Sequence, residues 1–110
     1  MSITSTQKNP LVTARIATGR YITSSTAAAF DIELGFTPRY VKVVNLGSSG
    51  LATLEWFEGM ADASALLEIT DGTKSVDTTT GITVSATGFT VGLNTDVNII
   101  NEQLSWLVIG

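Results

Sequence analysis

The sequence predicts an all-β fold: a single β-sandwich or jelly-roll-like domain that follows a flexible N-terminal arm. Short segments alternate apolar and polar residues with the period of two that is typical of a half-buried strand, and Gly, Asn and Asp turn signals separate these segments. Charged residues make up only 15% of the 110 residues, so Thr and Ser supply much of the polar composition, and β-branched Thr favours strands. Many short strands without alternating helices favour a sandwich or small barrel over βαβ units.

The arm is expected over residues 1–10, which are small and polar, carry Lys8 and end at Pro10. Such a composition cannot bury enough apolar surface to become ordered by itself. The β-sandwich domain is therefore expected over residues 11–110, a length that suits one domain with a modest core.

The first strands are expected at 11–17 and 21–23, with Gly19 between them. Residues 30–34 alternate three apolar side chains with two acidic ones, which predicts a strand with one solvent-facing side. A further strand is expected at 40–44, followed by a loop at 45–50 (NLGSSG).

The second half of the chain begins with a strand at 51–57, and the alanines within 59–67 allow either a helical turn or a loop there. Asp71-Gly72 predicts a hairpin turn between 67–70 and 73–76. Short strands are expected about 82–84 and 89–91, spaced by glycines, and the apolar run 104–109 predicts a central strand that is buried on both faces.

The composition argues against several kinds of chemistry. The chain has no cysteine, which excludes disulfides and thiolate catalysis, and no histidine, the commonest general base and metal ligand. Neither a secretory signal nor an apolar run of membrane-spanning length is visible, so we expect a soluble protein made in a cytoplasm and not bound to a membrane.

Charge is distributed unevenly along the chain. Residues 1–42 carry five basic and two acidic side chains, a net charge of +3, whereas residues 43–110 carry one basic and eight acidic side chains, a net charge of −7. This uneven charge could orient the protein on a partner or on copies of itself. The alternative is that the charged side chains are scattered over the surface and only keep the protein soluble. Nucleic acid is not expected as a partner, because the basic residues are few and the whole chain is acidic.

The candidate chemical motifs each have a simpler structural explanation. In GFTVGLNTDVN, at 88–98, no Lys follows the glycines as a phosphate-binding loop requires, so a strand and an Asn/Asp turn are expected. Glu55, Glu58 and Asp62 lie near Trp56 as in sugar hydrolases, but on a strand Glu55 points away from the indole.

Other side chains are candidates for metal ligands or for contact residues. Asp71, Asp77 and Asp96 invite a calcium site, although their spacing matches no calcium-binding loop, and no cofactor is expected. The two tryptophans are expected in the core, whereas Tyr21 and Tyr40 are candidates for exposed contact.

Two segments carry a family resemblance. GFTPRYVKVVN, at 35–45, resembles the opening of a β domain in virion proteins of tailed bacteriophages, and GITVSATGFTVGLNTDVNIINEQLSWLVIG, at 81–110, resembles its closing segment. EWFEGM, at 55–60, fits between them. These are packing and turn motifs over residues 35–110 rather than a catalytic signature.

The resemblance implies a non-enzymatic structural protein on the capsid surface of the virion, a capsid decoration (cement) protein. Its implied partners are the major capsid protein and further copies of itself in a homotrimer. From the residues we expect capsid or subunit contacts at Lys8, Pro10, Arg15 and Arg20, with the arm adding a strand to an exposed sheet edge. The alternative is a receptor- or glycan-binding module of a tail fibre or baseplate, which would use the loops at 45–50 and 94–101.

Overall fold

The computed structural model describes residues 15–47 and 51–110. These residues form eight β-strands and contain no helix: β1 (Ile16–Ile22), β2 (Phe30–Glu33), β3 (Tyr40–Asn45), β4 (Thr53–Phe57), β5 (Ser64–Glu68), β6 (Lys74–Val84), β7 (Gly88–Val91) and β8 (Gln103–Ile109). Accordingly, this part of the chain has no helix long and apolar enough to cross a membrane. The predicted arm, residues 1–10, lies outside the described residues.

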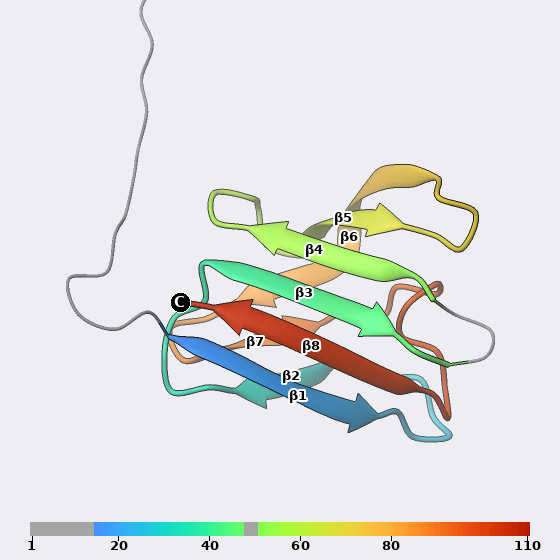
Figure 1. The fold of residues 1–110 in the computed structure, drawn as a ribbon, viewed down its shortest axis with the longest axis horizontal. Helices are drawn as coiled ribbons and strands as arrows, with labels where there is room; N and C mark the ends of the chain where they lie inside the picture. The colour runs from blue at the N-terminus through green and yellow to red at the C-terminus, as the bar shows by residue number, and fades with distance from the viewer. Residues whose placement is uncertain (1–14, 48–50) are drawn as a thin grey trace, which may run out of the picture.

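All eight strands belong to one antiparallel sheet with the order β1-β8-β3-β4-β5-β6-β7-β2. The sheet curls, so that β1, β8, β3 and β4 form a near layer, with β7, β2 and part of β6 behind it (Figure 1). The all-β prediction is confirmed. The sandwich or jelly roll is not confirmed, because the two layers are parts of one continuous hydrogen-bonded sheet rather than two separate sheets.

Strand β6 carries the sheet from one layer to the other. Its first part, Lys74–Asp77, pairs with β5, and its last part, Ile82–Val84, pairs with β7. The register on β5 is irregular between Ser64 and Ala65, the point at which the pairing passes from one part of β6 to the other. Such irregularities bend strands and increase their twist, which explains how one sheet can produce two layers here.

The core lies between the two layers. Phe89 on β7 meets Trp106 on β8 edge to face, with 5.7 Å between the ring centroids. The two edges of the sheet also approach each other, because Tyr21 on β1 stacks on Phe30 on β2 at a centroid distance of 3.9 Å. The largest fully buried apolar side chains are Phe89, Leu54, Ile82, Leu104, Val41, Val43, Val91, Val97 and Val108.

Core assignments for the aromatic residues were partly correct. Both tryptophans were predicted to be core residues, and Trp56 is buried while Trp106 packs against the core from a half-buried position. Tyr21 was expected to be exposed, but it is half-buried and faces the interior. Side chains alternate along β1, so Tyr21 points to the opposite face of the strand from the exposed Ile22 that follows it.

Gly19 does not interrupt the first strand, as the sequence had suggested. Strand β1 continues through Gly19, which lies opposite Trp106 of β8. A Cβ atom at Gly19 would lie 2.3 Å from Cζ2 of this indole. The tryptophan ring therefore occupies the space that a side chain would need, and the glycine permits close contact instead of breaking the strand.

The sequence allowed a helical turn or a loop within 59–67, but residues from Ser64 onward form the strand β5. Ala65 and Leu67 of β5 are buried in the core, so tertiary packing overrides the helical preference of the alanines. The predicted hairpin turn at Asp71-Gly72 is confirmed: Gly72 has φ +88°, and Asp71 Oδ1 accepts a hydrogen bond from the Thr73 amide.

The prediction for 104–109 was correct in type but wrong in position. This segment forms most of β8, which lies next to the edge strand β1 rather than in the middle of the sheet. Leu104 and Val108 are buried, but Ser105 and Leu107 on the opposite face are half-exposed. One face of β8 therefore belongs to the core, and the other belongs to the outer surface.

Candidate interaction surface

The four predicted contact residues do not form one described patch. Lys8 and Pro10 lie outside the described residues, while Arg15 directly precedes β1 and Arg20 lies within it. Side chains alternate along a strand, so Arg15 and Arg20 project from opposite faces of the sheet, roughly 17 Å apart along the chain. The structure therefore places both arginines at one edge without bringing them together.

The carboxylate of Glu55 is engaged on the outer face of β4. Tyr40 on the neighbouring β3 donates a hydrogen bond from its hydroxyl to Glu55 Oε2 at 2.6 Å. Burial, this hydrogen bond and the charge of Glu55 raise the pKa of Tyr40 to about 12, so the phenol stays protonated at neutral pH. Glu58 and Asp62 are exposed in the connection after β4, and Trp56 faces the core. Glu55 itself makes a cross-strand polar contact with Tyr40.

The three aspartates considered for calcium lie in different parts of the fold. Asp71 is in the β5–β6 turn, Asp77 is within β6, and Asp96 is in the connection before β8. Within residues 15–47 and 51–110, no group of three acidic side chains converges in a way that could hold a metal ion.

Asp77 instead joins β6 to the connection between β7 and β8. Its Oδ1 accepts hydrogen bonds from the amides of Thr79 and Thr80, and its Oδ2 accepts from Thr80 Oγ1 at 2.7 Å and Asn94 Nδ2 at 2.6 Å. Burial acts to raise the pKa of Asp77, but the hydrogen bonds from Thr80, Thr79 and Asn94 outweigh burial and lower that pKa to about 2.

Stability should therefore depend on the ionisation of Asp77. A carboxyl group with a lowered folded-state pKa contributes stability fully above its ordinary pKa of 3.8, and this contribution is lost as the pH falls toward 2. We expect Asp77→Asn to lower the urea midpoint of unfolding at pH 7 and to lower it much less near pH 2. The exposed Asp62→Asn is the matched control, and an equal effect of Asp77→Asn at both pH values would contradict the assignment.

Buried polar side chains hold the loops at the end of the sheet where β3 finishes. Asn45 is fully buried, and its Nδ2 donates to the Val97 carbonyl at 2.8 Å and to Glu102 Oε1 at 3.1 Å. Its Oδ1 accepts from the Gly47 amide at 2.6 Å. Thr23, just after β1, accepts a hydrogen bond at its hydroxyl oxygen from the Glu102 amide. These contacts join three connections that lie far apart in sequence.

The Asn/Asp turn predicted within GFTVGLNTDVN is confirmed. Asn94 Oδ1 accepts hydrogen bonds from the amides of Asp96 and Val97, at 2.9 and 3.2 Å. Asn98 is also buried, and its Nδ2 donates to the carbonyls of Ala28 and Gly92. The amide groups that might have bound a ligand are used to build the loop itself.

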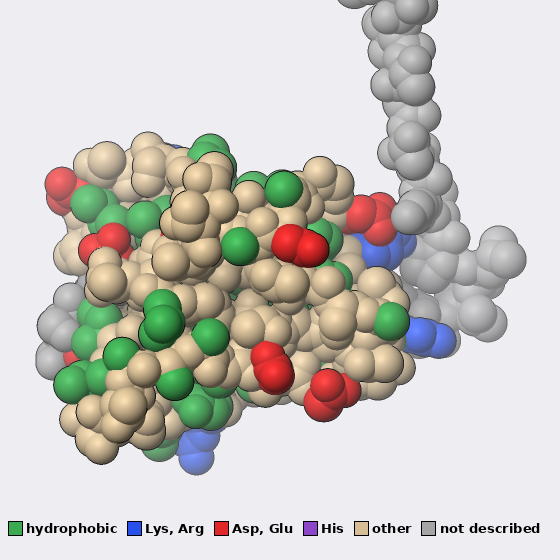
Figure 2. Space-filling view, turned by 180° about the vertical axis from the view of Figure 1, so that it is seen from behind, with side chains coloured by type: hydrophobic (Ala, Val, Ile, Leu, Met, Phe, Trp, Pro, Cys, Tyr) green, Lys and Arg blue, Asp and Glu red, His purple; other side chains and the backbone are tan. Residues whose placement is uncertain are grey.

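The same end of the molecule exposes apolar side chains. We call the side chains of Leu46, Leu51, Leu93 and Ile100 the loop-end surface; between 44% and 59% of each is exposed. The loops that carry them are held together by the contacts of Asn45 and Asn98. In the view from behind, hydrophobic side chains gather at the left, the end at which these loops lie (Figure 2). Exposed apolar side chains that gather in one place are typical of a contact with another protein.

A second group of apolar side chains crosses the outer face of the near layer. The strand registers place Ile16, Ile109, Tyr40 and Phe57 side by side on β1, β8, β3 and β4. The rings of Tyr40 and Phe57 are 5.2 Å apart between centroids, and Ile16 is 64% exposed. This row ends at β1, the edge strand of the near layer in the described part of the chain.

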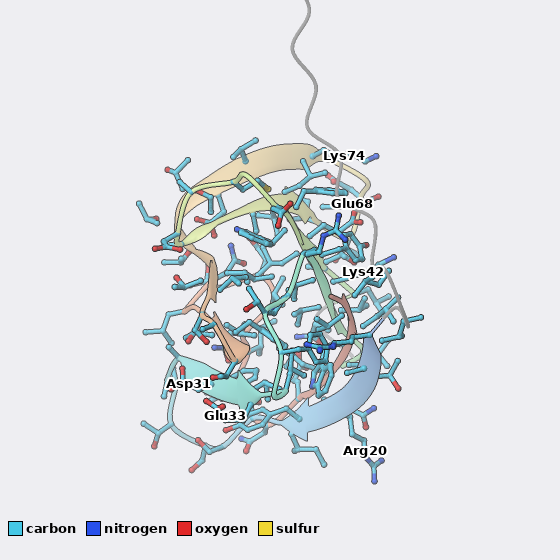
Figure 3. All side chains as sticks on the ribbon, turned by 90° about the vertical axis from the view of Figure 1, so that its left-hand side faces the viewer. Arg20, Asp31, Glu33, Lys42, Glu68 and Lys74 are labelled. Carbon is cyan, nitrogen blue, oxygen red and sulfur yellow. The ribbon has the colours of Figure 1, made fainter. Side chains whose placement is uncertain are left out.

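Charged side chains differ between the two edges of the sheet. In the side view, Arg20 projects from β1 at one edge of the curled sheet, and Asp31 and Glu33 lie on β2 at the other edge (Figure 3). The β1 edge is therefore basic and the β2 edge acidic, although both strands belong to residues 1–42, whose net charge is +3.

Sequence reasoning did not identify the loop-end surface, because Leu46, Leu93 and Ile100 resemble ordinary core residues when viewed in sequence. The available signal was their placement inside segments predicted as loops, where an apolar side chain has no strand neighbours to cover it. No protein-family model, no curated protein and no solved structure matches this chain.

Proposed function

We propose that this chain is a non-enzymatic structural protein of a tailed-bacteriophage virion, a decoration protein that binds the major capsid protein on the outer capsid surface as a homo-oligomer. The resemblance of residues 35–110 to virion β domains supports this role. The observation that carries the proposal is the loop-end surface, an apolar area on a small domain that has few charges.

The character of this end favours a protein partner over a glycan. Sugar sites combine aromatic platforms with polar groups that converge on the ligand. Here the amides of Asn45, Asn94 and Asn98 are buried and bonded within the protein, and the neighbouring exposed side chains are aliphatic. Burying aliphatic side chains against another protein is favourable by about 25 cal/mol per Å² of apolar surface.

The proposal is tested by binding to capsids that lack the decoration protein. Leu46→Lys and Leu93→Lys place a charge on the loop-end surface, so we expect each to weaken co-sedimentation with such capsids by roughly tenfold or more. Val76→Lys on β6 is the matched control, because Val76 is more exposed than Leu46 and Leu93 but is not one of the residues of this surface. Binding by both loop-end variants at the level of the wild type would contradict the proposal.

The predicted arm is tested in the same assay. Deletion of residues 1–10 should also reduce binding if the arm engages the capsid or a neighbouring subunit, whereas undiminished binding would exclude the arm from the contact. The homotrimer implied by the resemblance stays a prediction, which native mass spectrometry measures directly.

A further inference from the structure

The backbone of β1 has a free edge whose hydrogen-bonding groups can be assigned. Arg15 and Gly110 exchange hydrogen bonds in both directions, and the Thr23 amide donates to the Glu102 carbonyl. Hydrogen-bonded pairs alternate along an antiparallel ladder, so the odd-numbered residues of β1 bond to β8. The amides and carbonyls of the even-numbered residues therefore face away from β8, and no other strand of the described chain pairs with them: Ile16, Thr18, Arg20 and Ile22.

Within residues 15–47 and 51–110, the β2 edge of the sheet is protected, but the β1 edge is not. Strand β2 has only four residues, and two of them, Asp31 and Glu33, are exposed acids that disfavour pairing with another strand. Strand β1 has seven residues without Lys or Pro, and its two end residues, Ile16 and Ile22, are each 64% exposed. A long edge with exposed β-branched side chains is suited to pairing with a further strand.

The sequence of β1 is matched to a second copy of itself. An antiparallel pair centred on Gly19 places Ile16 opposite Ile22 of the partner subunit, and Thr18 opposite Arg20 of the partner subunit. In this register, every edge-facing amide and carbonyl of β1 finds an acceptor or donor. A pair centred on Arg20 would instead set two arginines against each other, and one centred on Thr18 would leave Ile22 without a partner in the facing β1 strand.

We propose that two copies of this chain associate through β1, antiparallel and centred on Gly19, so that their near layers form one continuous sheet. The contact is isologous, because the same strand serves both copies. The row formed by Ile16, Ile109, Tyr40 and Phe57 would then continue across the contact through Ile22 of the partner subunit. This inference does not rest on the phage role, since it uses only the geometry of the edge.

The first test removes one edge-facing donor. Thr18→Pro lacks the amide that faces the edge but keeps the bonds of β1 to β8, and Thr18→Val is the matched control because it keeps that amide. Native mass spectrometry should find a dimer for the wild type and for Thr18→Val, and a dissociation constant raised roughly tenfold or more for Thr18→Pro. A wild-type chain that is only monomeric or only trimeric at high micromolar concentration, or a Thr18→Pro variant with unchanged mass and affinity, would overturn the proposal.

The second test examines the register and does not depend on the folding of the proline variant. Ile16→Glu and Ile22→Lys should each weaken the dimer, whereas the double variant should recover it, since each introduced glutamate would face an introduced lysine across the contact. Recovery should disappear at high salt. A double variant as weak as the single ones would overturn the register centred on Gly19. Capsid binding is read separately, so failure of the dimer and failure of the proposed function are distinguishable.

Discussion

Replacing Gly88 by alanine should destabilise the domain by about 3 kcal/mol or more, because the added methyl group has no space. A Cβ atom at Gly88 would lie 2.0 Å from the carbonyl oxygen of Ile32 on the paired strand β2. The obstacle is backbone rather than a flexible side chain, so relief requires β2 to move away from β7. Urea unfolding monitored by tryptophan fluorescence measures the free-energy loss.

The same variant should have a local signature. The Leu34 amide, which donates to the Thr87 carbonyl beside Gly88, should lose protection from hydrogen exchange more than amides of β3 do. Thr87→Val is a matched control, because it changes an exposed neighbouring side chain and leaves the backbone contacts in place. Wild-type stability and wild-type exchange at Leu34 in Gly88→Ala would contradict the described packing of β2 on β7.

Asn45→Asp should cost about 3 to 5 kcal/mol at pH 7, although the two side chains have nearly the same shape. The substitution exchanges the Nδ2 donor for an oxygen that faces the Val97 carbonyl and Glu102 Oε1, at positions now 2.8 and 3.1 Å away. The fully buried site would then hold a carboxylate beside another carboxylate. Thermal unfolding at pH 7 measures the loss.

Lowering the pH distinguishes charge from shape as the cause of the stability loss in Asn45→Asp. Protonation of the new carboxyl group removes the repulsion and restores one donor, so the deficit of Asn45→Asp should shrink as the pH falls toward 4. Asn101→Asp, at an exposed position in the connection between β7 and β8, should be nearly neutral. A deficit that does not change with pH would show that Glu102 is not next to residue 45 in solution.

Local patterns in the sequence were sufficient for most strands. The alternation over 30–34 and 40–44 identified β2 and β3, and the Asp71-Gly72 signal identified the β5–β6 turn, since each depends on neighbouring residues only. Pairing partners were beyond this reasoning. Strand β2 pairs with β7, which lies more than fifty residues later, and nothing in either segment specifies the other.

Residues whose roles depend on a distant neighbour were misread for the same reason. Gly19 resembled a break because its function, contact with the Trp106 indole, is visible only after β1 and β8 are paired. Ala65 resembled a helical residue because alanine by itself favours helices. In the structure, burial between neighbouring strands determines its conformation instead. The β1 edge and the loop-end surface were not predictable either, since exposure depends on which strand lies at the edge and which loops meet.

The proposal that this chain decorates a capsid is tested most directly by counting its copies in purified phage particles. Quantitative mass spectrometry against the major capsid protein gives that ratio. A decoration protein should be present in a number comparable to that of the major capsid protein, and it should stay with capsids from which tails have been removed. Absence from the particle, or a few copies that separate with the tail, would contradict the assignment to the capsid surface.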